Sequence, residues 1–340
     1  MVSACSVAQP EETTTVSVSQ TTEETTTEVT TTTTETTPEP TKAPEPIKFN
    51  PHVHSDILSY EFCTEDWWDA LYNCIDAIRA GEDTFECKSK EAYKFATDGV
   101  TLGALYPAAC MLVEGDGYKD GTAKIKYKMD KDKFLERTKT FEAEIERILN
   151  EAIRSDYSDF EKALGLYEYI GKNFQYDYSS IDNNTVDEFS NYACLMTKQG
   201  ICTEFAASYA YLLLQVGIDA LEVGEFTQLC HAWTYVVLDG TGYFVDSTWG
   251  LVNDPSFDVD LNYFLETDDE RAEDGCDVDN DELSLVNWWK PDYDREPYKV
   301  TDDKYKFLHS HSVLRGMDPY NNVIKYYTML GEDKEYNYED

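Results

Sequence analysis

The sequence predicts an α+β fold in which a helix that begins at a cysteine packs on an antiparallel sheet. Apolar side chains recur at helical spacing after that cysteine, from Phe205 to Val216. The segments 231–237 and 243–247 alternate instead with a period of two, as strands do. Asp239-Gly240 lies between them and is a strong hairpin signal. A helix followed by a hairpin therefore forms the centre of the predicted fold.

The helix places a thiol in its first turn. Cys202 precedes the first residue of the apolar stripe by three positions. Unpaired N–H groups and the positive end of the helix dipole favour a thiolate over a thiol at such a position. Gly200 leaves the approach to this turn sterically open.

The hairpin brings a histidine and an aspartate together. If Asp239 and Gly240 are the two central turn residues, Asp246 pairs with Trp233. His231 is then a diagonal neighbour of Asp246 on the same face of the sheet, within reach of its side chain.

Each of these three residues has an ordinary structural explanation when it is considered alone. A cysteine at a helix start is commonly core filler, a strand histidine is commonly a hydrogen-bonded structural residue, and Asp246 could end a strand. Their coincidence favours a triad of Cys202, His231 and Asp246, in which an imidazole takes the thiol proton and a carboxylate orients the imidazole.

Three motifs carry a family resemblance. Gly200 to Ala206 matches G-[VI]-C-x-x-[FY]-A, His231 to Trp233 matches H-A-W, and Asp246 to Trp249 matches D-x-T-W. In these motifs the chain resembles the transglutaminase-like superfamily of papain-like thiol enzymes, over about residues 159–265. The resemblance implies a papain-like core and acyl transfer on peptide or amide substrates. We expect no cofactor and no metal site, since no CxxC pair or Cys/His spacing suggests zinc.

The partner of the oxyanion is harder to assign. The backbone N–H of Cys202 is a natural donor. Tyr192-Ala193 resembles the start of the family's turn that leads to the nucleophile, so we rank Tyr192 first as the side-chain donor, ahead of Gln175 and Gln199.

The resemblance covers more than one outcome of the chemistry. We expect hydrolysis of a peptide or protein substrate by a cysteine peptidase or amidase. The alternatives are a transglutaminase that cross-links protein glutamines, since the triad is the same, and a non-catalytic binding module of the same fold. An intact triad argues against the last of these.

Length and charge restrict the partners. The 340 residues can hold two domains, or one domain with extensions. A net charge of −39 repels nucleic acid and anionic membrane surfaces, so neither is an expected partner. Oligomeric state is not legible from the sequence.

The N-terminal residues predict a tether. Residues 1–10 resemble a bacterial lipobox in which Cys5 would carry the lipid, although a stray cysteine is the alternative. Residues 11–48 are rich in Thr, Glu and Pro and lack the apolar groups that would offset the entropy of ordering, which predicts a disordered stalk. Together they predict a bacterial cell-surface protein whose only membrane contact is a lipid anchor at Cys5.

Residues 49–150 predict a mainly helical region. The expected elements are a helix that ends at Gly81, a second helix capped by Ser89, an apolar segment 102–113 split at Pro107, one strand at 125–129 and a long helix at 134–153. Four cysteines here could form one or two disulfides, whose pairing stays open: Cys63, Cys74, Cys87 and Cys110.

Residues 151–330 hold the predicted catalytic domain and an acidic C-terminal extension. We expect a helix at 159–172 and a sheet-closing strand at 262–265. His309 and His311 are assigned to a solvated strand or loop. Three further cysteines are expected to be buried free thiols: Cys194, Cys230 and Cys276.

Overall fold

The computed structural model describes residues 43–178, 190–225, 227, 229–252 and 257–338. Residues 44–340 form one compact unit. The lipobox-like segment with Cys5, and most of the expected stalk, lie outside the described residues. No helix in the described part of the chain has the length and apolar character needed to cross a membrane.

A five-stranded antiparallel sheet forms the centre of the molecule, in the order β10-β6-β7-β8-β9. Its strands are β6 (Ala220–Glu225), β7 (His231–Leu238), β8 (Thr241–Val245), β9 (Phe264–Glu266) and β10 (Glu282–Leu283). The predicted hairpin is confirmed, because Thr234 pairs with Val245 and Val236 with Tyr243. Both turn residues have positive φ, 51° at Asp239 and 79° at Gly240, as the tightest hairpin turn requires.

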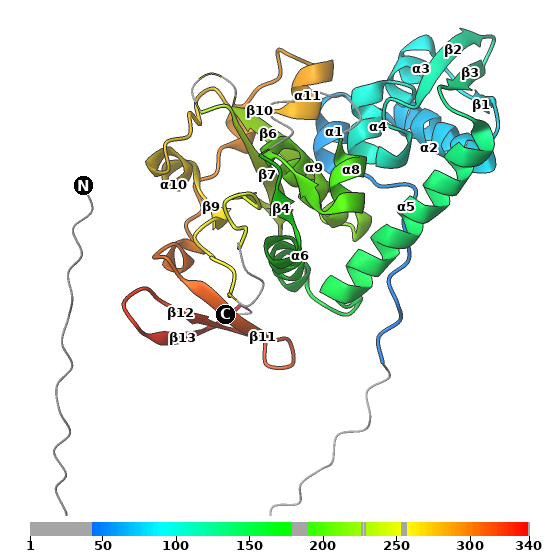
Figure 1. The fold of residues 1–340 in the computed structure, drawn as a ribbon. Helices are drawn as coiled ribbons and strands as arrows, with labels where there is room; N and C mark the ends of the chain where they lie inside the picture. Colours follow the sequence, from blue (N-terminus) through cyan, green and yellow to red (C-terminus); the bar gives the residue numbers. More distant parts are fainter. Residues whose placement is uncertain (1–42, 179–189, 226, 228, 253–256, 339–340) are drawn as a thin grey trace, which may run out of the picture. The chain divides into compact units, whose positions relative to one another are not determined.

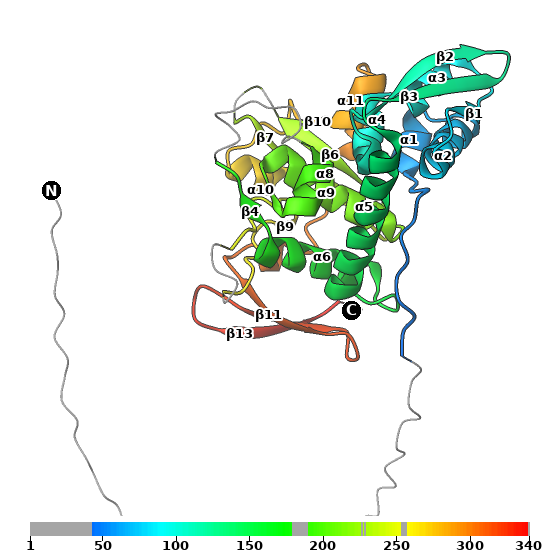
Figure 2. The same ribbon diagram turned by 45° about the vertical axis from the view of Figure 1, so that its right-hand side comes forward.

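Three helices lie beside this sheet (Figures 1 and 2). They are α6 (Asp159–Asn173), α8 (Asn191–Thr197) and α9 (Cys202–Gln215). The predicted helix that starts at Cys202 is α9, and it packs on β6 and β7. The α6 helix begins where it was expected, because the Ser158 side chain caps it and Glu161 bonds back to the Ser158 backbone N–H.

The N-terminal part contains the predicted helices and a sheet that the sequence only partly showed. The elements are α1 (Asp56–Glu61), α2 (Glu65–Ala80), α3 (Lys90–Ala96), α4 (Gly99–Leu105), a 3₁₀ turn (Pro107–Ala109), α5 (Lys131–Ala152), β1 (Thr84–Glu86), β2 (Val113–Lys119) and β3 (Thr122–Tyr127). Pro107 splits the apolar segment, and Gly81 ends α2 with φ of 71°. The β2 strand was missed because Glu114, Gly115 and Gly117 have low strand propensity, and pairing with β3 overrides it.

Hydrogen bonds fix this N-terminal part to the elements around the central sheet. The backbone N–H and carbonyl of Asn50 both hydrogen-bond the side-chain amide of Gln215, each at 2.8 Å. The indole N–H of Trp289 donates to the Thr101 hydroxyl at 2.9 Å. Asp219, which directly precedes β6, accepts a 2.9 Å bond from the Ile57 N–H. The strand β6, on which α9 packs, is therefore also fixed to the N-terminal part.

The C-terminal part adds short helices and a further three-stranded sheet at one end of the molecule (Figure 1). Its elements are α10 (Asp268–Glu273), α11 (Ser284–Trp289), the 3₁₀ turns Glu296–Tyr298 and Lys306–Leu308, and the antiparallel strands β11 (Val313–Asp318), β12 (Val323–Tyr327) and β13 (Asp333–Asn337). The predicted sheet-closing strand is β9, which pairs with β8 and starts two residues later than expected.

Three expectations about cysteine and histidine side chains are corrected. The four cysteines of the N-terminal part are free thiols, so the disulfides expected among them are absent: Cys63, Cys74, Cys87 and Cys110. Cys194 and Cys276 are buried as expected, but Cys230 is exposed because it precedes β7 in a loop. His309 is not solvated: its ring is buried and bonds the Glu270 carboxylate and the Phe264 carbonyl, at 2.7 and 2.9 Å.

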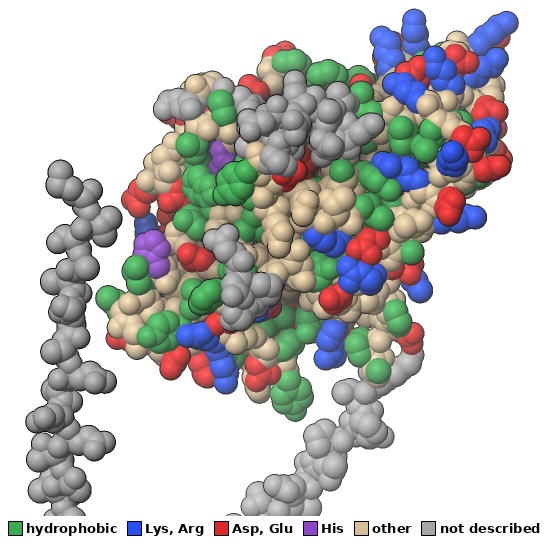
Figure 3. All heavy atoms as spheres, in the orientation of Figure 1, with side chains coloured by type: hydrophobic (Ala, Val, Ile, Leu, Met, Phe, Trp, Pro, Cys, Tyr) green, Lys and Arg blue, Asp and Glu red, His purple; other side chains and the backbone are tan. Residues whose placement is uncertain are grey.

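The surface shows a local concentration of positive charge in an acidic protein. Lysine side chains gather over the end of the molecule that carries β2 and β3 (Figure 3). Two of them pair with Glu114, Lys126 at 2.6 Å and Lys128 at 2.8 Å. This end therefore differs in charge from a chain that carries −39 overall.

Candidate active site

The nucleophile candidate is the first residue of α9. Cys202 is 8% exposed and lies with Ala206 against Ala232 of β7. The helix start is held by Glu204, whose carboxylate accepts a 2.9 Å bond from the Ile201 N–H. The thiol is thus fixed between the helix N-terminus and the strand that begins with His231.

Gly200 is required by close packing. A Cβ at this position would lie 3.0 Å from the Cys194 sulfur and 3.1 Å from the Glu204 Cβ. Any side chain here would push on the turn that presents Cys202.

The structure brings Cys202, His231 and Asp246 together. His231 is the first residue of β7, and Asp246 directly follows β8, in the register predicted from the hairpin. The Nε2–H of His231 donates to the Asp246 carboxylate at 2.6 Å, and the imidazole also hydrogen-bonds Cys202. One ring nitrogen therefore faces the carboxylate and the other faces the thiol.

The imidazole is held in its charged form. Burial alone would lower the pKa of His231, but the hydrogen bonds to Asp246 and Cys202 outweigh it and raise that pKa to about 9. The ring also stacks on Trp249, with 4.6 Å between centroids and 15° between planes. An imidazolium beside the sulfur stabilises a thiolate there.

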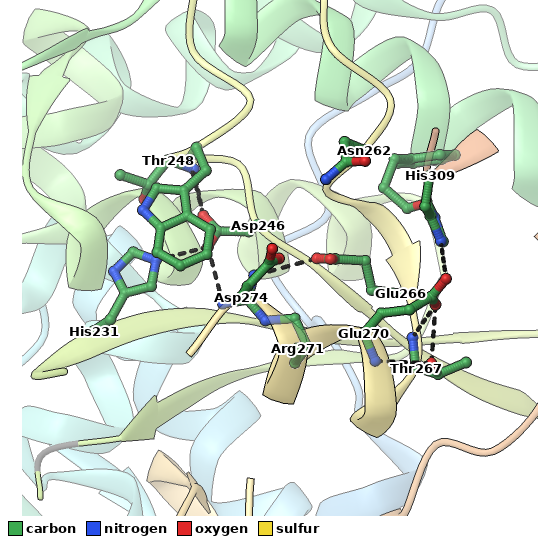
Figure 4. A network of polar contacts seen from close by, with 12 residues as sticks. His231, Asp246, Thr248, Asn262, Glu266, Thr267, Glu270, Arg271, Asp274 and His309 are labelled. Atoms are coloured by element: carbon green, nitrogen blue, oxygen red, sulfur yellow. Dashed lines mark hydrogen bonds and ion pairs between the residues drawn. The ribbon is translucent and has the colours of Figure 1, made fainter. Parts of the chain in front are cut away.

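Asp246 is fully buried and has no spare lone pair (Figure 4). Its Oδ1 accepts from the backbone N–H groups of Thr248 and Trp249, both at 3.0 Å. Its Oδ2 accepts from His231 and from Arg271, the latter at 3.0 Å. Burial raises the pKa of this carboxyl, but the charge of Arg271 and these bonds together keep it lowered.

Arg271 is a component of the site that the sequence reasoning missed. Its side chain is fully buried and also pairs with Glu266 at 3.2 Å. The guanidinium lies over the rings of Trp233 and Trp249, 4.5 and 4.7 Å from their centroids. The tryptophans of the H-A-W and D-x-T-W motifs therefore enclose the cation that faces Asp246. The one available signal was a single arginine within an otherwise acidic segment.

A second set of contacts anchors the helix that carries Arg271 (Figure 4). The Thr267 hydroxyl caps α10, and its backbone N–H and hydroxyl both donate to the Glu270 carboxylate, at 3.0 and 2.9 Å. Burial alone would raise the pKa of Glu270. The hydrogen bonds from His309 and Thr267 outweigh burial and lower the pKa of Glu270 to about 2. This pairing fixes the start of α10.

The structure does not bring Tyr192 to the thiol. The expected turn is the helix α8, and the Tyr192 ring stacks on Phe141 of α5, with 5.5 Å between centroids. The Arg137 guanidinium lies over the same ring, 3.1 Å from its centroid. The other two candidates, Gln175 and Gln199, pair with each other on the short strands β4 (Gln175–Tyr176) and β5 (Gln199–Gly200), with their side chains exposed.

Tyr176 takes the place expected for Tyr192. Tyr176 pairs with Gly200 in the β4–β5 ladder. Gly200 precedes the nucleophile Cys202 by two residues. Burial, with the charge of Cys202 as the next cause, raises the pKa of the Tyr176 hydroxyl to about 12, and a hydrogen bond with the Cys202 backbone opposes that rise. In that bond the Cys202 N–H donates to the Tyr176 oxygen, so both groups lie at the start of α9. An oxyanion that replaces this bond can accept from both of them. Gln175, the neighbour of Tyr176, was considered as a donor from the sequence, but Tyr176 was not.

The arrangement has the components of nucleophilic acyl transfer. A thiol, a charged imidazole, an orienting carboxylate and two oxyanion donors meet at the start of one helix. Among the described residues no group of three or more His, Cys, Asp or Glu side chains is placed to hold a metal ion.

Comparisons with known proteins give the following matches. The family model of the transglutaminase-like superfamily matches residues 146–246. The kyphoscoliosis peptidases of Mus musculus and Homo sapiens are 23% and 22% identical over 127 residues, which cover 33% of this chain and 19% of each relative. This chain thus spans about a fifth of the length of these curated relatives.

Two solved structures are also similar. One is a crystal structure of a TGase, with 14% identity and a TM-score of 0.28, over 42% of this chain and 47% of that chain. The other is a Cytophaga hutchinsonii protein named as a candidate cysteine protease, with 15% identity and a TM-score of 0.25, over 40% of this chain and 61% of that chain.

Proposed function

Because residues 146–246 belong to the transglutaminase-like superfamily, we propose that this protein hydrolyses peptide or amide bonds by thiol-dependent acyl transfer. The observation that carries the proposal is the buried contact of Cys202, His231 and Asp246, with an imidazole whose pKa is raised to about 9. A non-catalytic module of the same fold would not need a charged imidazole beside a thiol.

The reaction follows from the positions of these groups. The Cys202 sulfur attacks the substrate carbonyl carbon, and the Cys202 N–H and the Tyr176 hydroxyl stabilise the oxyanion. His231 gives its proton to the leaving amine as the carbon–nitrogen bond breaks, which leaves an acyl-enzyme. The neutral imidazole then takes a proton from water, whose oxygen attacks the thioester and releases the acid. Asp246 holds the ring orientation throughout.

Hydrolysis is favoured over glutamine cross-linking by the surroundings of the site. A transglutaminase must exclude water from the acyl-enzyme and admit an amine, usually along an apolar wall. Of the two tryptophans that could supply this wall, Trp233 is fully buried against Arg271. Trp249 contacts both Arg271 and the His231 ring. A glutamine-containing substrate and a labelled primary amine would distinguish the outcomes: incorporation that outpaces hydrolysis, and is lost in Cys202→Ala, would show a transglutaminase.

We also propose that the enzyme acts at a bacterial cell surface, tethered through a lipid on Cys5. The support is the lipobox-like residues 1–10 and the Thr/Glu/Pro-rich composition that follows. Membrane fractionation of the native host tests this. Equal membrane association of the Cys5→Ser variant would remove the proposal.

Triad variants test the enzymatic proposal. Peptide turnover should be abolished in Cys202→Ala, nearly abolished in His231→Ala and measurable in Asp246→Ala, because an orienting group is less essential than the base. Cys74→Ala, which removes a buried thiol of α2, serves as the matched control. Unchanged turnover in Cys202→Ala would end the proposal.

A further inference from the structure

A cavity of about 330 Å³ lies along the nucleophile helix. Residues from α4, α8, α9, α11 and β6 line it, and these elements contact one another around the start of α9. Figures 1 and 2 show α4 and α8 beside α9 in both views. Thr203 and Glu204, which directly follow Cys202, are part of the lining. The volume falls within the range of small-molecule sites in proteins, about 300 to 1,000 Å³.

The walls are apolar and are built from small residues. On α9 the lining follows one helix face through Ala207, Ala210 and Leu214. Two further lining residues, Val100 and Met111, are apolar yet 42% and 48% exposed. Exposed apolar groups beside an apolar cavity are expected where a ligand covers them.

Two carboxylates are the sole charged groups of the lining, which contains no Lys, Arg or His among the described residues. Glu222 projects from β6 on the face that packs against α9, opposite Thr234. Burial, and then the nearby charge of Glu204, raises the pKa of Glu222 to about 7. Burial also raises the pKa of Glu204, whose carboxylate is already bonded to the Ile201 N–H. An added positive charge would therefore be favourable beside Glu222.

We propose that this cavity binds a lysine side chain of the peptide substrate, next to the bond that Cys202 attacks. The proposal rests on the proposed function, since the peptide is the substrate of that site. The lysine stem contacts the alanine and leucine wall of α9, and the ammonium group pairs with Glu222. Lysine combines a flexible apolar stem with a compact charge, which is what a narrow apolar cavity with one acidic end accommodates.

Other side chains suit the cavity less well. An acidic side chain would be repelled by Glu204 and Glu222. A purely apolar one would fill the same space but would leave the buried Glu204 and the half-buried Glu222 without a cation. The difference between lysine and norleucine, which share the stem length, isolates the contribution of the charge.

Binding to the Cys202→Ala variant tests this inference without turnover. Nα-acetyl-lysine methylamide and its norleucine and glutamate counterparts would be titrated and followed by NMR. We expect the lysine compound to bind roughly tenfold more tightly than the norleucine compound, as one charge-assisted contact implies. Adding Glu222→Gln should abolish this preference. Ala210→Phe, which fills the cavity, should weaken both compounds, and Glu335→Gln, an exposed carboxylate, should change neither.

Two results would overturn the inference. Equal affinity for the lysine and norleucine compounds would remove the acidic contact, and binding unaffected by Ala210→Phe in a folded variant would place the ligand elsewhere. Melting temperatures of all variants show whether they fold. Peptide turnover by the wild type without a lysine preference would support the proposed function but not this site. Lysine binding without any turnover would support this site but not the proposed function.

Discussion

At the residue scale, the site depends on the buried Arg271 guanidinium, which contacts the Asp246 carboxylate of the triad. Removing only one partner of a buried ion pair leaves an uncompensated charge, which costs about 3 to 5 kcal/mol. Arg271 compensates the Asp246 carboxylate and also pairs with Glu266, although burial raises the pKa of Glu266 well above its ordinary value. We regard it as a positioning residue, because its contacts reach His231 only through Asp246.

Replacing Arg271 should therefore affect both stability and the titration of the site. In Arg271→Gln we expect the free energy of unfolding to fall by about 3 kcal/mol or more. The alkaline limb of the pH–activity profile should move upward, since a positive charge near the imidazolium is lost. Arg315→Gln, which removes a partly exposed guanidinium paired with Asp258, is the control. An Arg271→Gln variant that loses stability but keeps the wild-type profile would reduce Arg271 to a structural role.

The charge state of His231 predicts the direction of the pH dependence. Because its pKa is raised from about 6.5 to about 9, the imidazolium and the stability that it contributes are fully present below about 6.5, and both are lost as the pH rises through about 9. We expect kcat/KM to decline with the same midpoint, since the proton for the leaving amine is then missing. A profile that keeps rising beyond pH 10 would contradict this assignment.

At the element scale, the turn before α9 sets the position of the sulfur. The closest packing in this turn is at Gly200, where an added Cβ would contact the side chains of Cys194 and Glu204. The geometry of this turn is also what places Tyr176 of β4 beside Cys202. Local backbone packing, and not only side-chain chemistry, therefore determines the site.

The Gly200→Ala variant tests the tightness of this turn. We expect a loss of about 1 to 3 kcal/mol in the free energy of unfolding, because the Cβ contacts at 3.0 and 3.1 Å force a shift, and a larger relative loss of turnover. Gly99→Ala is the matched control for stability, since its Cβ meets only the flexible Met111 sulfur at 3.2 Å. Equal effects of the two changes would show that the turn tolerates a side chain.

What could be predicted from the sequence depended on how local the signal was. The register of the triad hairpin followed from Asp239 and Gly240 alone. Arg271 could not be predicted, because its contacts with Asp246 depend on where α10 is placed by the rest of the fold. The position of Tyr192 could not be predicted for a similar reason: its segment forms a helix that packs its ring on Phe141, whereas a parallel pairing between distant segments places Tyr176 near Cys202.

At the scale of the whole molecule, the compact unit begins close to the end of the Thr/Glu/Pro-rich segment. Near this point the Ser155 hydroxyl bonds the Glu45 carbonyl at 2.7 Å, and Asn150 accepts a 2.8 Å bond from the Ile47 N–H. The Phe49 ring then packs edge-on against Tyr106. Residues from about 45 onward are thus part of the fold.

Two deletions should separate the tether from the fold. Removing residues 16–42 should leave the melting temperature nearly unchanged, because their composition offers little apolar surface to bury. Extending the deletion to residue 50 should lower it, since the contacts of Ile47, Phe49 and Asn50 are lost. A large drop with the shorter deletion would show that the predicted stalk joins the core.

The central claim is that Cys202 is the nucleophile that the surrounding groups activate. The most direct measurement is the alkylation of the native protein by iodoacetamide near neutral pH, with each cysteine followed by peptide mass spectrometry. Cys202 should be modified much faster than Cys194, which is also buried but whose thiol pKa burial raises to about 12. The His231→Ala variant should lose most of that difference. If Cys202 reacts no faster than Cys194 in the folded wild type, the catalytic account is contradicted.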